Sequence, residues 1–396
     1  MSACRPQSPE PARLQLQSAH AAKIQKLILV YTQSAEMGLA SLRDILRALP
    51  ETEALVINQF APNSAAFRTF VTQLLRDGIG RNRQGKPRVQ FVQEESAYGP
   101  WPRDQALVDE QGLMWVSSSN LHQLQATMLA LDESYGIPRR AAAFSFTGAS
   151  LLRSDKGLLC PDRLDTVYLA NYLQGPFLPM ASPAPPEPFH LDLLVMPLNE
   201  RVIAVGDDQL AKTALLSLSA EEVAKVAEQW VAEYCAAASN VEFQVVEGRL
   251  KLRELNRPAL IIRSLLEEKL RIVAALSQGG AFREAVQAEP DYVWDDQIAA
   301  HLTRLGFAVV RVPFWPAAHG AANGKKVYGL PMLCYPNCLV WEEGILMPVY
   351  GIPVLDEMAK TRLEGASRKT VYPVSGGALL GYGYSGPHCL TLEFRK

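Results

Sequence analysis

The chain has 396 residues, of which 48% are hydrophobic and 20% charged, and its formal net charge is -2. This composition is typical of a folded globular protein and excludes wholesale disorder and a collagen-like repeat. Because the charge is almost balanced, we expect neither nucleic acid nor a membrane surface as a partner. No run of about 20 apolar residues is present, and the first residues lack the apolar core of a secretory signal. The six cysteines are scattered, which indicates reduced thiols and a cytoplasmic location.

The N-terminal part of the chain predicts alternating strands and helices after a polar start. Residues 1–25 are polar and contain proline, so we expect a flexible arm there. The apolar run Lys26–Tyr31 predicts a strand, and the spacing of leucines over Met37–Leu49 predicts a helix. A strand at Ala54–Asn58 and a helix at Ala65–Arg76 repeat this order. The fold class is therefore α/β.

Further along the chain, pairs of short apolar segments are separated by turn residues, which is typical of hairpins. Many of them are followed by a helical pattern, such as Asp208–Ser217 or Val354–Leu363. We count about five such units of hairpin plus helix. The paired segments include Gln105–Asp109 with Leu113–Ser117, Ala142–Thr147 with the residues after it, His190–Pro197 with Arg201–Val205, and Asn337–Trp341 with Ile345–Val349.

One stretch departs from this pattern. Residues from about 220 to 305 contain longer helical patterns, at Ala220–Ala237, Arg257–Leu276 and Trp294–Leu305. We interpret this stretch as a helical insertion. Residues 26–396 are then expected to form a single domain, because the units recur on both sides of it.

Four short segments contain residue types suited to catalysis. They are Trp101-Pro-Arg103-Asp104, Thr147-Gly-Ala-Ser150, His190-Leu-Asp192 and Gly386-Pro-His388-Cys389. Each has an ordinary alternative when taken singly: an Arg-Asp pair at a helix cap, a structural histidine at a strand start, a buried cysteine in the core.

The order of these segments resembles the guanidine-modifying pentein superfamily, and most closely its agmatine deiminase and bacterial peptidylarginine deiminase branch. The segment Tyr335–Val349 is also similar to that branch. The resemblance covers roughly residues 26–215 and 300–396. It implies a five-bladed α/β propeller of ββαβ units around a central polar site, and it leaves homo-oligomerisation open. A fold by itself does not fix an activity.

The resemblance also implies roles for individual residues. Cys389 is expected to be the nucleophile and His190 the general acid and base. Asp104 and Asp192 are expected to hold a planar guanidinium cation through paired hydrogen bonds. Further substrate contacts are expected from Trp101, Arg103, Thr147 and Asn337. We assign proton transfer to His190 and not to His388, because neighbouring side chains on a strand face opposite sides.

Two residues of one segment depart from the pattern of that branch, and the first of them matters for the chemistry. The branch carries Glu-Gly-Gly where this chain has Thr147-Gly-Ala149, so the carboxylate that would face the histidine is absent. A hydroxyl offers a hydrogen bond but no charge. Another acid could take its place, the enzyme could be slow or altered in substrate, or the site could bind without turnover.

Three functions therefore remain open. The first is a cofactor-independent and metal-independent deiminase of a small guanidino compound (agmatine-like or arginine-like) or of peptidyl arginine. The second is an amidinotransferase, since Cys389–Leu392 is also similar to the C-terminal segment of the amidinotransferases. The third is a degenerate pentein that binds a ligand or partner without chemistry. Cys334 and Cys338 have no second pair at metal spacing, and the chain has no nucleotide-binding glycine motif.

Overall fold

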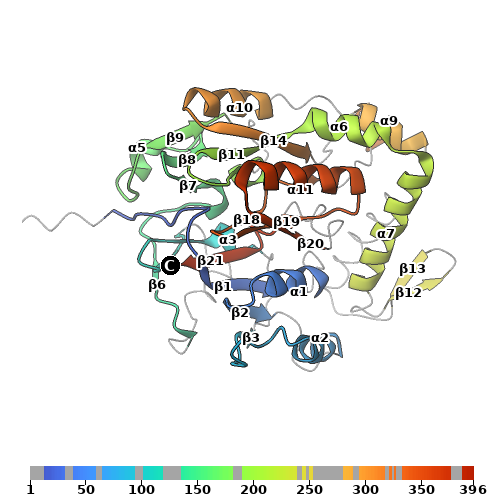
Figure 1. Cartoon of the computed structure of the whole chain (residues 1–396), viewed down its shortest axis with the longest axis horizontal. Helices are drawn as coiled ribbons and strands as arrows, with labels where there is room; N and C mark the ends of the chain where they lie inside the picture. The colour runs from blue at the N-terminus through green and yellow to red at the C-terminus, as the bar shows by residue number, and fades with distance from the viewer. Residues whose placement is uncertain are drawn as a thin grey trace, which may run out of the picture.

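The computed structural model describes most of the chain, with gaps between the described segments. Those segments are residues 13–31, 39–58, 65–93, 101–118, 135–181, 190–238, 243–246, 249–252, 280–288, 294–316, 321–322, 325–326, 332–375 and 386–396. They form a mixed α/β structure (Figure 1).

Four sheets are built in the same way, with an antiparallel hairpin followed by a third strand that lies parallel to the second. The three strands of each sheet are β4 (Ala106–Val108), β5 (Met114–Val116) and β6 (Arg139–Ala141); β7 (Leu152–Ser154), β8 (Gly157–Pro161) and β9 (Phe177–Met180); β10 (Val195–Pro197), β11 (Val202–Asp207) and β14 (Ala308–Trp315); and β18 (Leu339–Val340), β19 (Gly344–Pro348) and β20 (Thr370–Val374). In the third of these sheets, β17 (Leu333–Cys334) is added beside β14. The strand predicted over residues 142–147 is not one of them, since β6 ends before it and β7 begins after it.

The fifth sheet has the same arrangement but joins the two ends of the chain. The last strand, β21 (Thr391–Arg395), is antiparallel to β1 (Ile24–Tyr31), and β1 is parallel to β2 (Glu53–Asn58). A further parallel strand, β3 (Val89–Gln93), lies at the other side of β2. Five sheets therefore repeat one strand arrangement, an antiparallel pair followed by a parallel third strand, and the pairing of β21 with β1 ties the C-terminal segment to the N-terminal one (Figure 1).

Helices cross between the parallel strands of these units. They include α1 (Leu39–Ala48) between β1 and β2, α5 (Thr166–Leu169) between β8 and β9, and α11 (Pro353–Ser367) between β19 and β20. Another helix, α2 (Ala65–Arg76), connects β2 to β3. The amphipathic pattern of α1 places Leu42, Ile45 and Leu46 in the core, as their spacing predicts.

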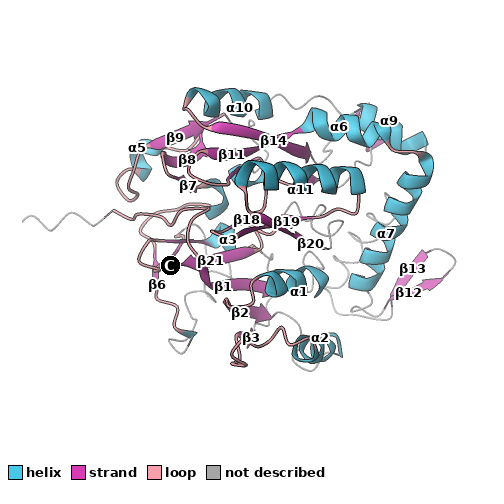
Figure 2. Cartoon of the chain, viewed as in Figure 1, coloured by secondary structure: helices cyan, strands magenta, loops and turns pink. Residues whose placement is uncertain are grey.

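The connection between β11 and β14 contains the predicted insertion. The described helices of this connection are α6 (Asp208–Ser217), which precedes the predicted insertion, and α7 (Ala220–Ala238), α9 (Gly280–Ala288) and α10 (Trp294–Arg304) within it. They lie along the rim of the molecule in Figure 2. The connection also includes a hairpin of β12 (Phe243–Val246) and β13 (Arg249–Leu252), which the helical interpretation did not anticipate. The helix predicted over residues 257–276 lies outside the described residues. Because α10 contacts β11 and β14, the end of this connection belongs to the body of its unit.

The described part of the expected N-terminal arm is packed on the body, so the prediction of a flexible arm is wrong for residues 13–25. Leu14 bridges Leu173 and Leu16 bridges Asp109 through the backbone. Leu16 is buried, and so is His20, whose ring lies 2.8 Å from the Asp155 carboxylate. Two leucines in a polar sequence supply the apolar contacts, which composition alone did not reveal. Residues 1–12 lie outside the described residues.

Several strands are buried along their whole length, including β8, β19 and β21. Such continuous burial occurs where both faces of a sheet are covered. Among the helices that the structure describes, none combines the length and the apolar character needed to cross a bilayer.

Candidate active site

The predicted site residues occupy equivalent places in the five units, immediately before the first strand of each. Three of these places are short helical turns: α3 (Pro102–Gln105) before β4, η2 (Gly148–Ser150) before β7 and η3 (Leu191–Leu193) before β10. Successive turns contact each other, since η2 touches both α3 and η3. The residues at these five places are Asp104, Thr147, His190 with Asp192, Asn337 and Cys389.

Two glycines allow the turns to approach closely. A Cβ atom on Gly148 would lie 2.6 Å from the carbonyl oxygen of Ala106 and even closer to that of Arg103. A Cβ atom on Gly386 would lie 2.5 Å from the carbonyl oxygen of Asn337. Real Cβ atoms do not come this close to backbone, so the glycines are required for the backbone contacts between neighbouring turns.

Cys389 is fully buried and is held at two atoms by Asn337. Its backbone N–H donates to Asn337 Oδ1 at 3.1 Å, and Asn337 Nδ2 donates to the Cys389 Sγ at 3.1 Å. The same amide also donates to the Asp192 carbonyl oxygen at 3.1 Å. Asn337, predicted as a substrate contact, therefore links the nucleophile candidate to the turn that carries Asp192.

The thiol of Cys389 donates to Asp192 Oδ2 at 3.2 Å. Burial raises the pKa of the Cys389 thiol well above its ordinary value, and the negative charges of Asp192 and Asp104 raise it further. The thiol is consequently protonated in the ligand-free site. A thiolate requires a compensating positive charge nearby.

The structure brings the four predicted catalytic side chains together. The Nδ1 atom of His190 lies 3.5 Å from Asp104 Oδ1. One ring nitrogen of His190, one carboxylate oxygen of Asp192 and the Cys389 Sγ all lie within 4.8 Å of one another. These residues are up to 285 positions apart in the sequence. Their proximity is observed, while their catalytic roles stay predictions.

Two buried carboxylate oxygens in this cluster, Asp104 Oδ1 and Asp192 Oδ1, have no hydrogen-bond partner among the described residues. Burial raises the pKa of Asp104 to about 6, and Asp192 adds to that rise, while the charges of His190 and Arg103 oppose it. Burial alone would also raise the pKa of Asp192, but the hydrogen bond from His388 is the largest of the influences that hold this pKa below its ordinary value. Buried carboxylates with free oxygens are strong acceptors for a cation that carries several N–H donors.

His388 lies in this cluster, against the sequence-based expectation that it points away. Its Nδ1 is 2.7 Å from Asp192 Oδ2, and its side chain is 1% exposed. The expectation relied on the alternation of a strand, but residues 387–390 form a turn and β21 begins only at Thr391. Burial and the charge of Arg103 lower the pKa of His388.

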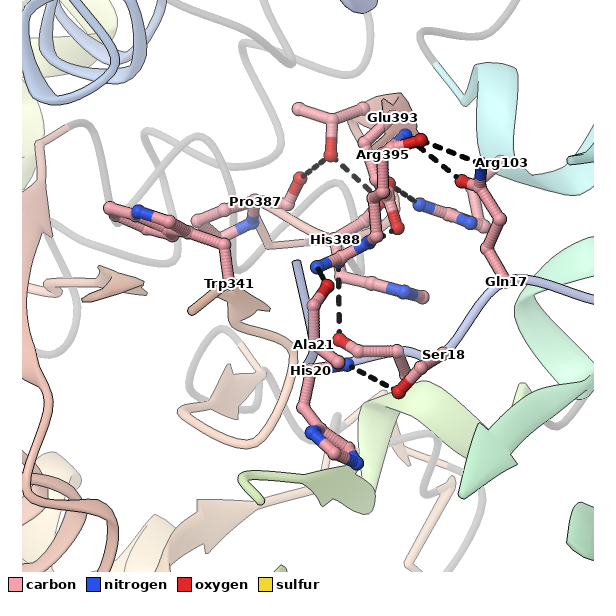
Figure 3. A network of polar contacts seen from close by, with 12 residues as sticks. Gln17, Ser18, His20, Ala21, Arg103, Trp341, Pro387, His388, Glu393 and Arg395 are labelled. Atoms are coloured by element: carbon pink, nitrogen blue, oxygen red, sulfur yellow. Dashed lines mark hydrogen bonds and ion pairs between the residues drawn. The ribbon is translucent and has the colours of Figure 1, made fainter. Parts of the chain in front are cut away.

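Arg103, predicted to contact substrate, has a buried partner within the protein. Its guanidinium bonds to the Glu393 carboxylate, and Arg395 Nη2 bonds to the other oxygen of Glu393 at 3.1 Å (Figure 3). Arg395 in turn contacts the N-terminal segment, where its backbone N–H donates to Gln17 Oε1. Sequence reasoning missed Glu393 and Arg395. Their signal is the alternation of charged and apolar residues along β21, which here places the charged residues inside the molecule.

The other two predicted substrate contacts lie beside the cluster. Trp101 precedes α3, is half-buried and packs against two hydrophobic clusters. Thr147 precedes η2, is half-buried, and its carbonyl accepts a hydrogen bond from the Ser150 N–H at 3.0 Å. Their contact with substrate stays a prediction. The carboxylate that faces His190 in this structure is Asp104.

Among the residues that the structure describes, two clusters have ligand atoms close enough for a metal ion. His190, Asp192 and Cys389 form the first, and its nitrogen, oxygen and sulfur donors are types that zinc accepts. The second is made of Asp207, Asp208 and Asp295. There, Arg311 forms ion pairs with Asp207 at 3.2 Å and with Asp295 at 2.8 Å, so a protein cation already balances the acidic charge.

No model of a known protein family matches the chain, and no curated protein matches it by sequence. Solved structures do match over almost its whole length. An agmatine deiminase of C. jejuni is 13% identical, with a TM-score of 0.56, and the match covers 97% of this chain and 96% of that one. A variant of the C. jejuni enzyme in which serine replaces one cysteine, with substrate bound, is 11% identical, with a TM-score of 0.57 and 97% coverage of both chains. An agmatine deiminase of Enterococcus faecalis is 12% identical, with a TM-score of 0.52, 97% coverage of this chain and 96% of that one.

These similarities establish the fold. Together with the five repeated sheets, they confirm the predicted α/β propeller of the pentein type. At such low identity they do not by themselves transfer an activity.

Proposed function

We propose that this chain is a deiminase that hydrolyses the guanidino group of a substrate to a ureido group and ammonia. The observation that carries the proposal is a pair of buried carboxylate oxygens, Asp104 Oδ1 and Asp192 Oδ1, which accept no hydrogen bond from the described residues and lie beside the Cys389 thiol and His190. The expected substrates are agmatine-like, arginine-like or peptidylarginine-like. The matched agmatine deiminases support this substrate class.

The two carboxylates suit a guanidinium ion because of their charge and their free lone pairs. A guanidinium is planar, permanently charged near neutral pH and carries N–H donors on each nitrogen. Asp104 and Asp192 would bind it through charge-assisted hydrogen bonds, which are stronger than those between neutral groups. Binding would also give both of these oxygens a hydrogen-bond donor, so the ligand-free site is complementary to a cation.

The bound cation would also activate the nucleophile. In the free site, burial and two negative charges keep the Cys389 proton in place. A guanidinium placed between Asp104 and Asp192 opposes those charges and lowers the thiol pKa. The thiolate would therefore form only when substrate is present, which protects the thiol from unrelated electrophiles.

The reaction then proceeds in two halves through a covalent intermediate. Cys389 loses its proton to His190, and Sγ forms a bond to the central guanidinium carbon. The C–N bond to one terminal nitrogen breaks, His190 returns a proton to that nitrogen, and ammonia leaves. A water then gives one proton to His190 and adds to the carbon, the C–S bond breaks to release the thiolate, and the added oxygen loses its other proton to solvent, which leaves the ureido product. His190 finally returns its proton to the Cys389 thiolate.

Asp104 takes on two tasks in this proposal. It accepts from the substrate, and at 3.5 Å it is also the carboxylate beside His190, where the deiminase branch has the glutamate that Thr147 replaces. A carboxylate next to imidazole stabilises its protonated form. With Thr147 in place of that glutamate and Asp104 beside His190, we expect a slower reaction and not the loss of all chemistry.

The test is to incubate the protein with a panel of guanidino compounds, including agmatine, arginine and an arginine peptide, and to measure ammonia and ureido product. We expect turnover of at least one compound and none with Cys389→Ala. The proposal fails if the wild type and Cys389→Ala produce equal ammonia with every compound.

The same protein and compounds also test the two alternative functions, an amidinotransferase and a binding protein without turnover. With an amine acceptor added, mass spectrometry distinguishes transfer of the amidino group to the amine from transfer to water. Thr147 is the observation that favours a site that binds without turnover, and binding of guanidino compounds with no covalent adduct on Cys389 would support it. Cytoplasmic location and any homo-oligomer stay predictions.

A further inference from the structure

The buried contact between His388 and Asp192 is not used by the chemistry above. Their side chains are 1% and 0% exposed, and the distance from His388 Nδ1 to Asp192 Oδ2 is 2.7 Å. The same oxygen accepts from the Cys389 thiol, while Oδ1 has no partner among the described residues. Because a carboxylate is planar, a bond that fixes Oδ2 also fixes the direction of Oδ1.

The turn that carries His388 is itself held in place. The His388 N–H donates to the Asn337 carbonyl oxygen at 3.4 Å, and the hydroxyl of Thr391 donates to the Pro387 carbonyl oxygen at 2.8 Å. Cys389 directly follows His388 in this turn. One turn therefore supplies both the nucleophile candidate and the group that anchors the carboxylate beside it.

Charged groups around His388 determine its ionisation. Burial and the positive charge of Arg103 lower the pKa of His388, while Asp192 and Glu393 act in the opposite direction. Figure 3 shows His388 next to the Arg103–Glu393 contact. The net effect is a lowered pKa, so the ring is neutral near pH 7 and donates from Nδ1–H. A neutral donor orients a carboxylate without cancelling its charge.

The groups that face Asp192 come from several elements. His190 shares its turn, His388 and Cys389 come from the turn before β21, and Asp104 comes from α3. Burial raises the pKa of the Cys334 thiol in β17, and the negative charge of Asp192 raises it further. Among the groups that hold the pKa of Asp192 down, the His388 hydrogen bond is the largest influence.

We propose that His388 is a positioning residue, which holds Asp192 through Oδ2 so that the negatively charged Oδ1 is directed at the guanidinium of the substrate. This inference rests on the proposed function for its substrate class. His388 itself does not touch the reacting atoms.

Three substitutions of one residue test the proposal. Asn places an amide N–H where the imidazole has Nδ1, so His388→Asn keeps the donor. His388→Leu keeps apolar volume and removes the donor, and His388→Gln moves the amide one bond further out. A control is His20→Leu, which breaks another histidine–aspartate contact, the 2.8 Å bond of the buried His20 to the exposed Asp155, away from the site.

The principal readout is alkylation of Cys389 by chloroacetamidine, a cation, relative to chloroacetamide, its neutral counterpart. In both reactions Sγ bonds to the methylene carbon as chloride leaves, and mass spectrometry gives the rate. We expect the wild type to prefer the cation. Since hydrogen bonds to charged groups are strong, we expect this preference to fall about tenfold to a hundredfold in His388→Leu and in His388→Gln. His388→Asn should stay within about threefold of the wild type, and His20→Leu should alter thermal stability alone.

The pH profile of the same reaction gives a second readout. Loss of the bond lets the pKa of Asp192 rise, so the acidic limb for chloroacetamidine should move to higher pH in His388→Leu and return in His388→Asn. A residue that only supports the fold would lower the melting temperature without moving this limb. If His388→Leu does not fold, His388→Gln against His388→Asn makes the same comparison.

The possible results separate the two proposals. If guanidino compounds are turned over but the cation preference of His388→Leu and His388→Gln equals that of the wild type, the positioning role is wrong and the function stands. If no compound is turned over while the preference is present and depends on His388, the function is wrong and the positioning role stands. A wild type without preference for the cation overturns both.

Discussion

Gly148 offers a test of how closely the turns of neighbouring units must pack, since Gly148→Ala adds one methyl group where η2 meets α3. The added Cβ would lie 2.6 Å from the Ala106 carbonyl oxygen, about 0.8 Å short of the 3.4 Å at which ordinary contact begins. The Arg103 carbonyl oxygen is closer still. Both neighbours are backbone atoms, so the conflict cannot be relieved by a side-chain rotation, and α3 or η2 has to move.

The displacement should affect activity more than folding. Overpacking of this kind costs about 1–3 kcal/mol of stability. Asp104 lies in α3, so a shift of almost 1 Å moves one of the two carboxylates that we propose bind the guanidinium. Misplacement of about 1 Å can lower a rate by roughly 100-fold. We expect kcat/KM for the best guanidino substrate to fall between about tenfold and a hundredfold while the protein stays folded at 25 °C.

The assay combines steady-state ammonia release with thermal unfolding. The control is Gly365→Ala in α11, where an added Cβ meets nothing within 4 Å, so we expect about 0.5–1 kcal/mol of added stability and unchanged kinetics. Full activity in Gly148→Ala, with a melting temperature equal to that of the wild type, would refute the argument that this contact positions Asp104.

Other predictions concern charge. Because the pKa of Asp104 is raised to about 6, kcat/KM should rise with pH through that value as the carboxylate ionises. Asp104→Asn should remove this acidic limb and lower kcat/KM about tenfold to a hundredfold. A wild-type pH profile without the limb would contradict the assignment of Asp104. Glu393→Gln leaves two buried arginines without their carboxylate, so urea unfolding should show about 3–5 kcal/mol less stability at pH 7. The control is Glu221→Gln, which breaks an exposed ion pair with Lys225 and should cost under about 0.5 kcal/mol. Since the pKa of Glu393 is lowered to about 2, its stabilisation is present above its ordinary pKa and is lost as pH falls toward 2, so the difference between the two proteins should shrink in acid. Zinc should bind at the cluster that includes Cys389 and inhibit the enzyme reversibly, and equal zinc affinity in Cys389→Ala by calorimetry would exclude that site.

The secondary structure of most units could be predicted from the sequence because it depends on local patterns. The leucine spacing of α1 and the apolar runs of β1 and β2 are found where periodicity places them. The placement of Asp104, Asp192 and Cys389 near the starts of short strands could also be predicted. Their resemblance to one superfamily then implied a shared site.

Local patterns failed where the structure depends on contacts between distant segments. His388 was assigned to a strand, but it belongs to the turn before β21, and its ring therefore faces Asp192. The polar residues near the N-terminus predicted an arm, yet Leu16 is buried against the body. In both cases the neighbours that decide the conformation lie 90 or more positions away.

The sequence by itself determined the fold class, the repeated units and the chemical groups available for catalysis, because residue type and spacing are local properties. Only the tertiary structure decided that Asp104, His190, Asp192 and Cys389 meet, and that Arg103 is paired with Glu393. The physical reason is that a carboxylate acts as a surface charge, an ion-pair partner or a cation site according to which groups pack around it. That packing is set when five sheets assemble and their first turns come into contact.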